Sequence, residues 1–258
     1  MQKWQLASAL FLLYLSVVAL LPRGLPPGRR WKVFAGVGLG ATALLASLAL
    51  APDGVANVWV LPGAVLLIGY WTSGLLFVAP MPRAERWLAE LDESLGIQSI
   101  ATRCPRAIAE FLEFAYSGIY PLILISLYFA LRAGVSPDRF WTTIVVTDYV
   151  CFGVLPWFQT RPPRTLGFDT PWRASWRAIN ERILAGGSIQ VNTFPSGHAA
   201  EGLASALLVT GAPLPVVAWM FFNALAVSAG AVLGRYHYAA DAIAGWVVAL
   251  LVWGALLL

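Results

Sequence analysis

Charged side chains are scarce in this sequence. Asp, Glu, Lys and Arg make up only 12% of the 258 residues, while hydrophobic residues make up 59%. An average soluble domain carries about 25% charged residues, and a soluble fold cannot hide so much apolar surface. The composition therefore excludes an ordinary soluble domain. The net charge of +4 suits an anionic lipid surface or an anionic substrate, and we expect no nucleic-acid partner.

Residues that form disulfides or bind metals are equally rare. Cys104 and Cys151 are the only cysteines, and neither has a motif partner. The sequence therefore indicates no disulfide framework and no cysteine-based metal site. There are also only two histidines, His198 and His237. We expect no metal and no cofactor.

Long apolar runs dominate what is present. A helix needs about 20 mostly apolar residues to cross the hydrocarbon core of a membrane. Eight runs approach this length: 4–21, 33–50, 58–78, 111–131, 140–158, 197–210, 216–233 and 239–257. The first run is expected to be a retained helix rather than a cleaved signal peptide. The sequence therefore predicts an all-α, polytopic membrane helix bundle with about eight transmembrane helices.

One helix is expected to lie on the membrane surface. Between the third and fourth runs, residues 82–97 place Trp87, Leu88, Leu91 and Leu95 at helical spacing, with charged residues elsewhere. This amphipathic pattern predicts an interfacial helix.

The basic residues predict the orientation of the chain. With eight spans, fourteen of the 17 basic residues fall on one side, and Lys3, Arg132 and Arg139 fall on the other. Positive residues in short loops tend to stay in the cytoplasm, so the rich side should be cytoplasmic. We expect an integral protein of the plasma (inner) membrane.

Both histidines stand at the edge of an apolar run. The first belongs to Phe-Pro-Ser-Gly-His-Ala-Ala-Glu, residues 194–201, in which Pro195 and Ser196 open a helix. The free N–H groups at a helix N-terminus, here those of Ser196 and Gly197, attract anions, and glycine lets an anion approach the backbone closely. This segment therefore predicts a phosphate-binding turn.

The second histidine has a carboxylate four residues away. In Gly-Arg-Tyr-His-Tyr-Ala-Ala-Asp, residues 234–241, His237 and Asp241 fall on one helix face. A carboxylate bound to one ring nitrogen fixes the tautomer and leaves the lone pair of the other nitrogen for nucleophilic attack. Arg235 adds a planar guanidinium suited to phosphate oxygens.

These segments are expected to meet. With eight spans, both histidine segments begin helices from the same side, and Arg161-Pro-Pro-Arg164 closes the fifth run on that side. Together they supply the groups needed for metal-free phosphoryl transfer. Two histidines with Asp241 and Glu201 could alternatively form a metal site, but the Ser-Gly turn and the arginines argue against it.

Three ordered segments resemble the three motifs of the type 2 phosphatidic acid phosphatase superfamily: Arg161-Pro162, Pro195-Ser-Gly-His198, and the stretch from Arg235 through His237 to Asp241. The pattern His237-Tyr-x-x-Asp241 followed by Gly245 is most similar to the branch that includes the inositol phosphorylceramide synthases. The resemblance covers about residue 110 to the C-terminus. We expect N-terminal transmembrane helices and the interfacial helix in residues 1–106, and a catalytic membrane domain in residues 107–258.

The resemblance implies a role for each motif residue. It implies a phosphohistidine intermediate on His237, with Asp241 as its partner and His198 as the acid that protonates the leaving group. No metal ion is implied. Four further residues are expected around the phosphate: Arg161, Ser196, Gly197 and Arg235.

The chain departs from the phosphatase pattern at two positions. The family has a lysine seven residues before Arg161, where this chain has Val154, and an arginine six residues before His237, where this chain has Ala231. Arg164 and Arg235 are the candidates to replace these two basic residues. The phosphotransferase branch shares both departures, so transfer to an alcohol rivals hydrolysis.

The sequence therefore predicts a membrane phosphatase that hydrolyses a phosphomonoester or diphosphate of a phospholipid or isoprenoid, whose tail enters between the helices. One alternative is a phospholipid headgroup phosphotransferase, since water or an alcohol would attack the same phosphohistidine. The other is a non-enzymatic membrane transporter or lipid-binding protein.

Overall fold

The computed structural model describes residues 1–21, 24–167 and 174–257. In these ranges the chain forms α-helices, one short 3-10 helix at Pro163–Leu166 and an isolated β-bridge between Thr160 and Asn192. The helices are α1 (Lys3–Leu20), α2 (Pro27–Ala49), α3 (Val55–Trp59), α4 (Leu61–Gly74), α5 (Pro82–Ser94), α6 (Ile97–Arg103), α7 (Arg106–Ser117), α8 (Ile119–Arg132), α9 (Pro137–Val154), α10 (Ser175–Gly187), α11 (Gly197–Leu208), α12 (Leu214–Leu233) and α13 (Ala239–Ala255). The all-α prediction is confirmed. Arg23 and Arg173, two basic residues counted on the predicted cytoplasmic side, lie outside the described residues.

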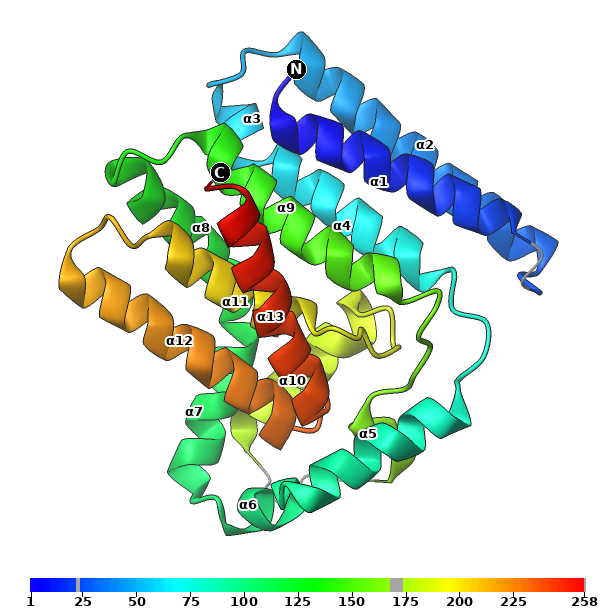
Figure 1. Cartoon of the computed structure of the whole chain (residues 1–258), viewed down its shortest axis with the longest axis vertical. Helices are drawn as coiled ribbons and strands as arrows, with labels where there is room; N and C mark the ends of the chain where they lie inside the picture. The colour runs from blue at the N-terminus through cyan, green and yellow to red at the C-terminus, as the bar shows by residue number, and fades with distance from the viewer. Residues whose placement is uncertain (22–23, 168–173, 258) are drawn as a thin grey trace.

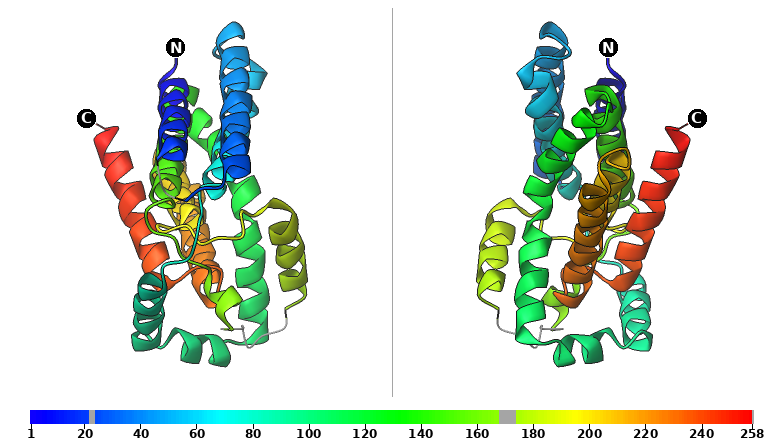
Figure 2. Two further views of the ribbon diagram at one scale, coloured as in Figure 1. Left: turned by 90° about the vertical axis from the view of Figure 1, so that its right-hand side faces the viewer. Right: turned by 90° about the vertical axis from the view of Figure 1, so that its left-hand side faces the viewer.

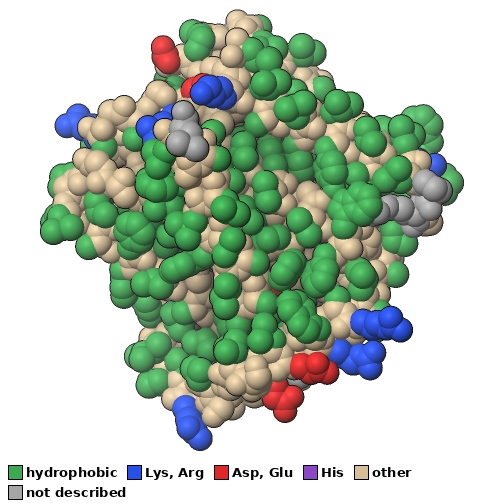
Figure 3. Space-filling model, in the orientation of Figure 1, with side chains coloured by type: hydrophobic (Ala, Val, Ile, Leu, Met, Phe, Trp, Pro, Cys, Tyr) green, Lys and Arg blue, Asp and Glu red, His purple; other side chains and the backbone are tan. Residues whose placement is uncertain are grey.

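The long helices lie side by side as a bundle, and α5 and α6 lie across one end of it (Figure 1, Figure 2). Both termini lie toward the opposite end (Figure 2). Hydrophobic side chains cover the middle of the face drawn in Figure 3, while charged side chains lie toward its rim. Large exposed apolar surfaces of this kind mark contact with a membrane or a partner.

Several helices can cross a membrane. Within the described ranges, α1, α2 and α12 are long and apolar enough to do so. The pair α7 and α8 adds a fourth candidate if it counts as one broken span, and α13 is apolar but shorter. The polytopic helical bundle is confirmed, and the number of eight spans stays a prediction.

Two apolar runs predicted as single helices are broken, and this detail of the prediction is wrong. The run 58–78 divides at Val60 into α3 and α4, because Pro62 stands in the first turn of α4 and lacks the N–H that a continuous helix requires. The run 111–131 divides at Gly118, where α7 and α8 meet at 64°, and Pro121 follows in the first turn of α8. Between α9 and α11, the polar stretch 160–194 contains α10.

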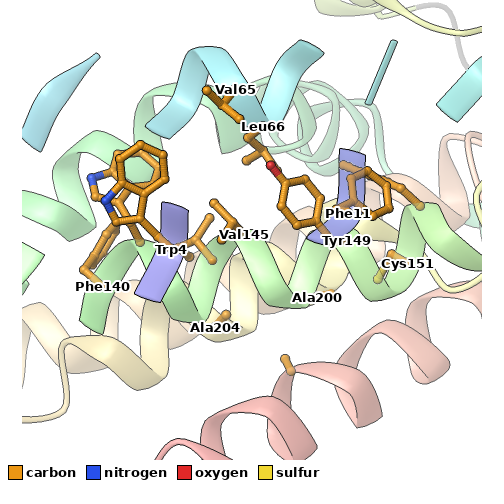
Figure 4. Packing of buried hydrophobic residues seen from close by; sticks show 14 of the residues in the cluster. Trp4, Phe11, Val65, Leu66, Phe140, Val145, Tyr149, Cys151, Ala200 and Ala204 are labelled. Carbon is orange, nitrogen blue, oxygen red and sulfur yellow. The ribbon is translucent and has the colours of Figure 1, made fainter. Parts of the chain in front are cut away.

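The N-terminal helices support α9. The rings of Phe11 in α1 and Tyr149 in α9 stack with centroids 4.1 Å apart (Figure 4). The Tyr149 hydroxyl donates a hydrogen bond to the buried Ser8 Oγ at 3.1 Å. This packing fixes the position of α9, one wall of the site described below.

Candidate active site

The N-termini of α11 and α13 are in direct contact. The Ser196 N–H donates to the Asp241 carbonyl oxygen at 2.9 Å. A Cβ added at Gly245 would lie 2.5 Å from the Ser196 carbonyl oxygen, so only glycine permits this approach. The expectation that the Ser196 N–H is free for an anion is wrong, because this group joins the second motif to the third. The Ser196 side chain instead caps α11 by accepting from the Ala199 N–H.

His237 and Asp241 form the expected pair, but the prediction that they share one helix face is wrong, because α13 begins at Ala239 and His237 precedes it. His237 Nδ1 lies 3.3 Å from Asp241 Oδ2, which also accepts a hydrogen bond from the Tyr238 N–H at 2.9 Å. Asp241 is completely buried. An ionised carboxylate only accepts hydrogen bonds, so this contact favours a proton on Nδ1 and leaves Nε2 as the free lone pair.

His198 lies beside this pair. The two histidine rings have centroids 6.3 Å apart. His198 stacks on Tyr116 at 5.1 Å and meets the edge of Tyr120 at 5.6 Å. Its Nε2 atom is buried and has no hydrogen-bond partner within the described part of the chain. This nitrogen therefore has no partner among the described residues that would compete with a substrate.

Arg161 is held by a carboxylate of α5. Glu85 Oε1 accepts from the backbone N–H and from Nε of Arg161, both at 2.9 Å, and Glu85 Oε2 accepts from Nη2 at 2.8 Å. These hydrogen bonds hold the pKa of the Glu85 carboxyl below its usual value. The arginine side chain is 45% exposed.

Arg235 is held by a second carboxylate of the same helix. Its backbone has a left-handed φ of 62°, unusual for a residue other than glycine. Its Nη1 donates to Asp92 Oδ2 at 3.0 Å, and Asp92 Oδ1 accepts from the Ala239 N–H at 2.9 Å. Burial raises the pKa of Asp92, although the Ala239 N–H and the Arg235 charge oppose that rise.

Glu85 and Asp92 were not predicted as residues of the site. They are seven residues apart, about two helical turns, and therefore fall on one face of α5. That spacing was the available signal.

Arg164, the candidate replacement for the missing lysine, reaches the cavity. Its backbone N–H donates to the Arg235 carbonyl oxygen at 3.0 Å, which joins the segment after the first motif to the third motif. Its guanidinium carbon lies 5.6 Å from the centre of the Tyr236 ring. Arg164 lines the cavity together with both histidines, whereas Arg161 and Arg235 do not line it.

The cavity has a volume of about 650 Å³ and unlike ends. Arg164, His198 and His237 lie at its polar end, beside Gly197. Its other walls are mostly apolar and aromatic side chains of α3, α4, α8 and α9, among them Trp59 and Trp71. The N-terminal helices, which the motif resemblance leaves out, therefore contribute to the walls of the site.

A buried network behind the site ties α10 to α7 and to the third motif. Arg177 Nη1 donates to Glu113 Oε1 and to the Gly234 carbonyl oxygen, each at 2.9 Å. The Tyr236 hydroxyl donates to Glu113 Oε2 at 2.5 Å. Tyr236 in turn stacks on Tyr116 at 4.1 Å. None of these residues could be assigned to the site from the sequence, because only the fold brings them together.

Comparison with known proteins decides the family. Residues 86–255 match the family model described as the PAP2 superfamily. The chain belongs to the PAP2 superfamily. This is the type 2 phosphatidic acid phosphatase superfamily, whose members are phosphatases and phosphotransferases, and the match supports phosphatase-type activity on lipid phosphates. No curated protein and no solved structure matches the chain.

The match begins within α5, the helix whose carboxylates hold Arg161 and Arg235. Assignment to the branch of the inositol phosphorylceramide synthases stays a prediction, as does the division of the chain at residue 106.

Proposed function

We propose that this PAP2 superfamily protein is an integral membrane lipid-phosphate phosphatase. It hydrolyses a phosphomonoester or diphosphate of a phospholipid or isoprenoid. One observation carries the proposal: the His237–Asp241 pair lies beside His198 at the polar end of a cavity whose other walls are mainly apolar. Such a cavity suits a ligand with an anionic head and an apolar tail.

The proposed reaction has two steps. In the first, His237 Nε2 attacks phosphorus and the bond from phosphorus to the lipid oxygen breaks, while His198 donates a proton to the leaving oxygen. In the second, His198 accepts a proton from water, the water oxygen attacks phosphorus, and the bond from phosphorus to Nε2 breaks. Phosphate leaves and His237 is regenerated. Asp241 stabilises the positive charge that the His237 ring gains in the first step.

The phosphate oxygens need positive partners in both steps. Arg164 is placed to contact them from the cavity wall, and the N-terminus of α11 at Gly197 adds backbone N–H groups. In this proposal Arg161 and Arg235 contribute positive charge from behind the motif segments. Their ion pairs with α5 also anchor the first motif at Arg161 and the third motif at Arg235, two residues before His237.

The proposal places the reaction at the cytoplasmic face of the plasma membrane. The α5 and α6 end of the bundle would lie there, as the basic residues predict. The lipid tail would occupy the apolar part of the cavity.

Headgroup transfer is the second candidate. Val154 and Ala231 stand where the phosphatase pattern has basic residues, and Ala231 is completely buried. An alcohol in place of water in the second step would give a phosphodiester product instead of phosphate.

The test is to measure phosphate release and headgroup transfer by purified protein in detergent with chelator. A panel of lipid phosphates is assayed with and without candidate alcohols, and wild type is compared with His237→Ala. The proposal predicts metal-independent phosphate release that the variant loses. Products that contain the alcohol would favour headgroup transfer. Activity retained by His237→Ala would refute His237 as the nucleophile. Inactivity of both proteins across the panel would favour a transport or binding role.

A further inference from the structure

A second polar group lies inside the cavity, apart from the histidines. Asp148 of α9 and Glu201 of α11 both line the cavity and are only 2% and 7% exposed. Glu201 follows His198 by three residues, so the two share one face of α11. Asp148 Oδ1 lies 3.3 Å from the position that a Cβ would take on Gly197. The carboxyl pair is therefore next to the proposed phosphate site.

This pair accepts too few hydrogen bonds from the protein. The two carboxyl groups lie close to one another, Asp148 on α9 and Glu201 on α11. Neither forms an ion pair with a basic side chain of the described residues. Asp148 Oδ1 is buried, and within the described ranges no N–H or hydroxyl group donates to it. Buried polar atoms are normally hydrogen-bonded, so Asp148 Oδ1 lacks a donor from the part of the chain that the structure describes.

The position of the pair indicates which part of a lipid could supply that donor. Glu201 lies one helical turn farther into the bundle than His198, on the side of the apolar walls. With a phosphate at the histidines and a tail between α4 and α8, the pair faces the first few bonds of the lipid backbone. A hydroxyl group there can donate a hydrogen bond, whereas ester oxygens can only accept one.

We propose that Asp148 and Glu201 form a subsite for a hydroxyl group on the lipid backbone close to the phosphate. The subsite selects lipid phosphates with a free backbone hydroxyl over those in which that oxygen is esterified or alkylated. This inference rests on the proposed function, because the orientation of the lipid follows from a phosphate at the histidines. Asp148 and Glu201 act in specificity and take no part in proton transfer.

The test uses two lipids that differ only at this group. They are a 1-acyl-2-hydroxyglycerol 3-phosphate and its 2-O-methyl counterpart, compared by kcat/KM. Leaving a buried acceptor without its donor should lower kcat/KM by about ten-fold or more. Wild type should therefore prefer the hydroxyl lipid by at least that ratio. The double variant Asp148→Leu/Glu201→Met should bring the ratio close to one. Glu201→Gln, which keeps a hydrogen-bonding group, should retain part of the preference.

Asp138→Asn is the matched control. Asp138 is a carboxylate at the other end of α9, where Oδ1 accepts from the Trp4 N–H, and it does not line the cavity. This variant should keep the wild-type ratio even if it lowers stability.

A binding measurement separates the subsite from the chemistry. Non-hydrolysable phosphonate analogues of the two lipids are titrated into wild-type protein. Tighter binding of the hydroxyl phosphonate without turnover of any lipid would refute the proposed reaction and support the subsite. Phosphate release without preference, together with equal binding of both phosphonates, would refute the subsite and leave the reaction intact. A double variant that folds and keeps the wild-type ratio would also refute it, since the carboxyl pair would then only join α9 to α11.

Discussion

Gly245→Ala should separate the two helices that carry the catalytic motifs. The added Cβ would meet the Ser196 carbonyl oxygen at 2.5 Å and the Ala200 nitrogen at 3.2 Å. Both are backbone atoms, so no side-chain rotation relieves the contact. Ordinary contacts begin at 3.4 Å, so α11 and α13 must move apart by about 0.9 Å. That movement would lengthen the 2.9 Å hydrogen bond from Ser196 to Asp241.

Gly245→Ala is expected to lower both the stability of the fold and the rate of phosphate release. Overpacking of this kind destabilises a fold by about 1–3 kcal/mol, which should appear as a lower melting temperature in detergent. A displacement of about 1 Å near the reacting groups can cost about 100-fold in rate, so kcat for phosphate release should fall by up to that factor. Gly254→Ala is the control, because a Cβ on Gly254, in the same helix, meets no atom within 4 Å. Equal melting temperatures and rates for the two variants would show that α11 and α13 do not depend on this close contact.

Further predictions concern α5 and the orientation of the chain. Because the folded-state pKa of Glu85 is lowered, its pair with Arg161 stabilises the fold above the ordinary carboxyl pKa, and this stabilisation is lost as pH falls through the lowered value. Glu85→Gln should flatten the melting temperature against pH in that acidic range, and an unchanged acid profile would contradict the assignment. Asp92→Asn removes the anion that faces the buried Arg235 guanidinium and should lower the free energy of unfolding by about 3 kcal/mol. The double variant Asp92→Asn/Arg235→Met, followed by chemical denaturation, should recover part of that loss. Reporters fused to the two termini should both lie outside the cytoplasm, and a cytoplasmic C-terminal reporter would contradict the eight-span orientation.

The local chemistry of the site could be predicted because it depends on short spacing. Asp241 is four positions after His237, and this short spacing predicts that the two side chains meet, although His237 stands just before α13 and not within it. The meeting of His198 with His237 could also be predicted, because both segments begin helices from one side of the bundle. The structure places both histidines in one cavity.

The partners of the arginines could not be predicted, because they depend on how a surface helix docks. The amphipathic pattern of residues 82–97 predicts a helix, but it does not show that Glu85 and Asp92 face Arg161 and Arg235. Hydropathy also overlooks breaks such as the one at Gly118, because both α7 and α8 are apolar enough to pass as one span. Glycine and proline near such a break were the local signals.

The proposed reaction depends on a phosphohistidine at His237, and this intermediate can be trapped. Purified protein is mixed with a lipid phosphate labelled on phosphorus and quenched in alkali, which preserves phosphohistidine, and the labelled peptide is then sequenced. The proposed reaction predicts a transient label on His237 that is absent in His237→Ala and reduced in Asp241→Asn. A label on His198, or turnover with no labelled histidine at any time, would contradict it.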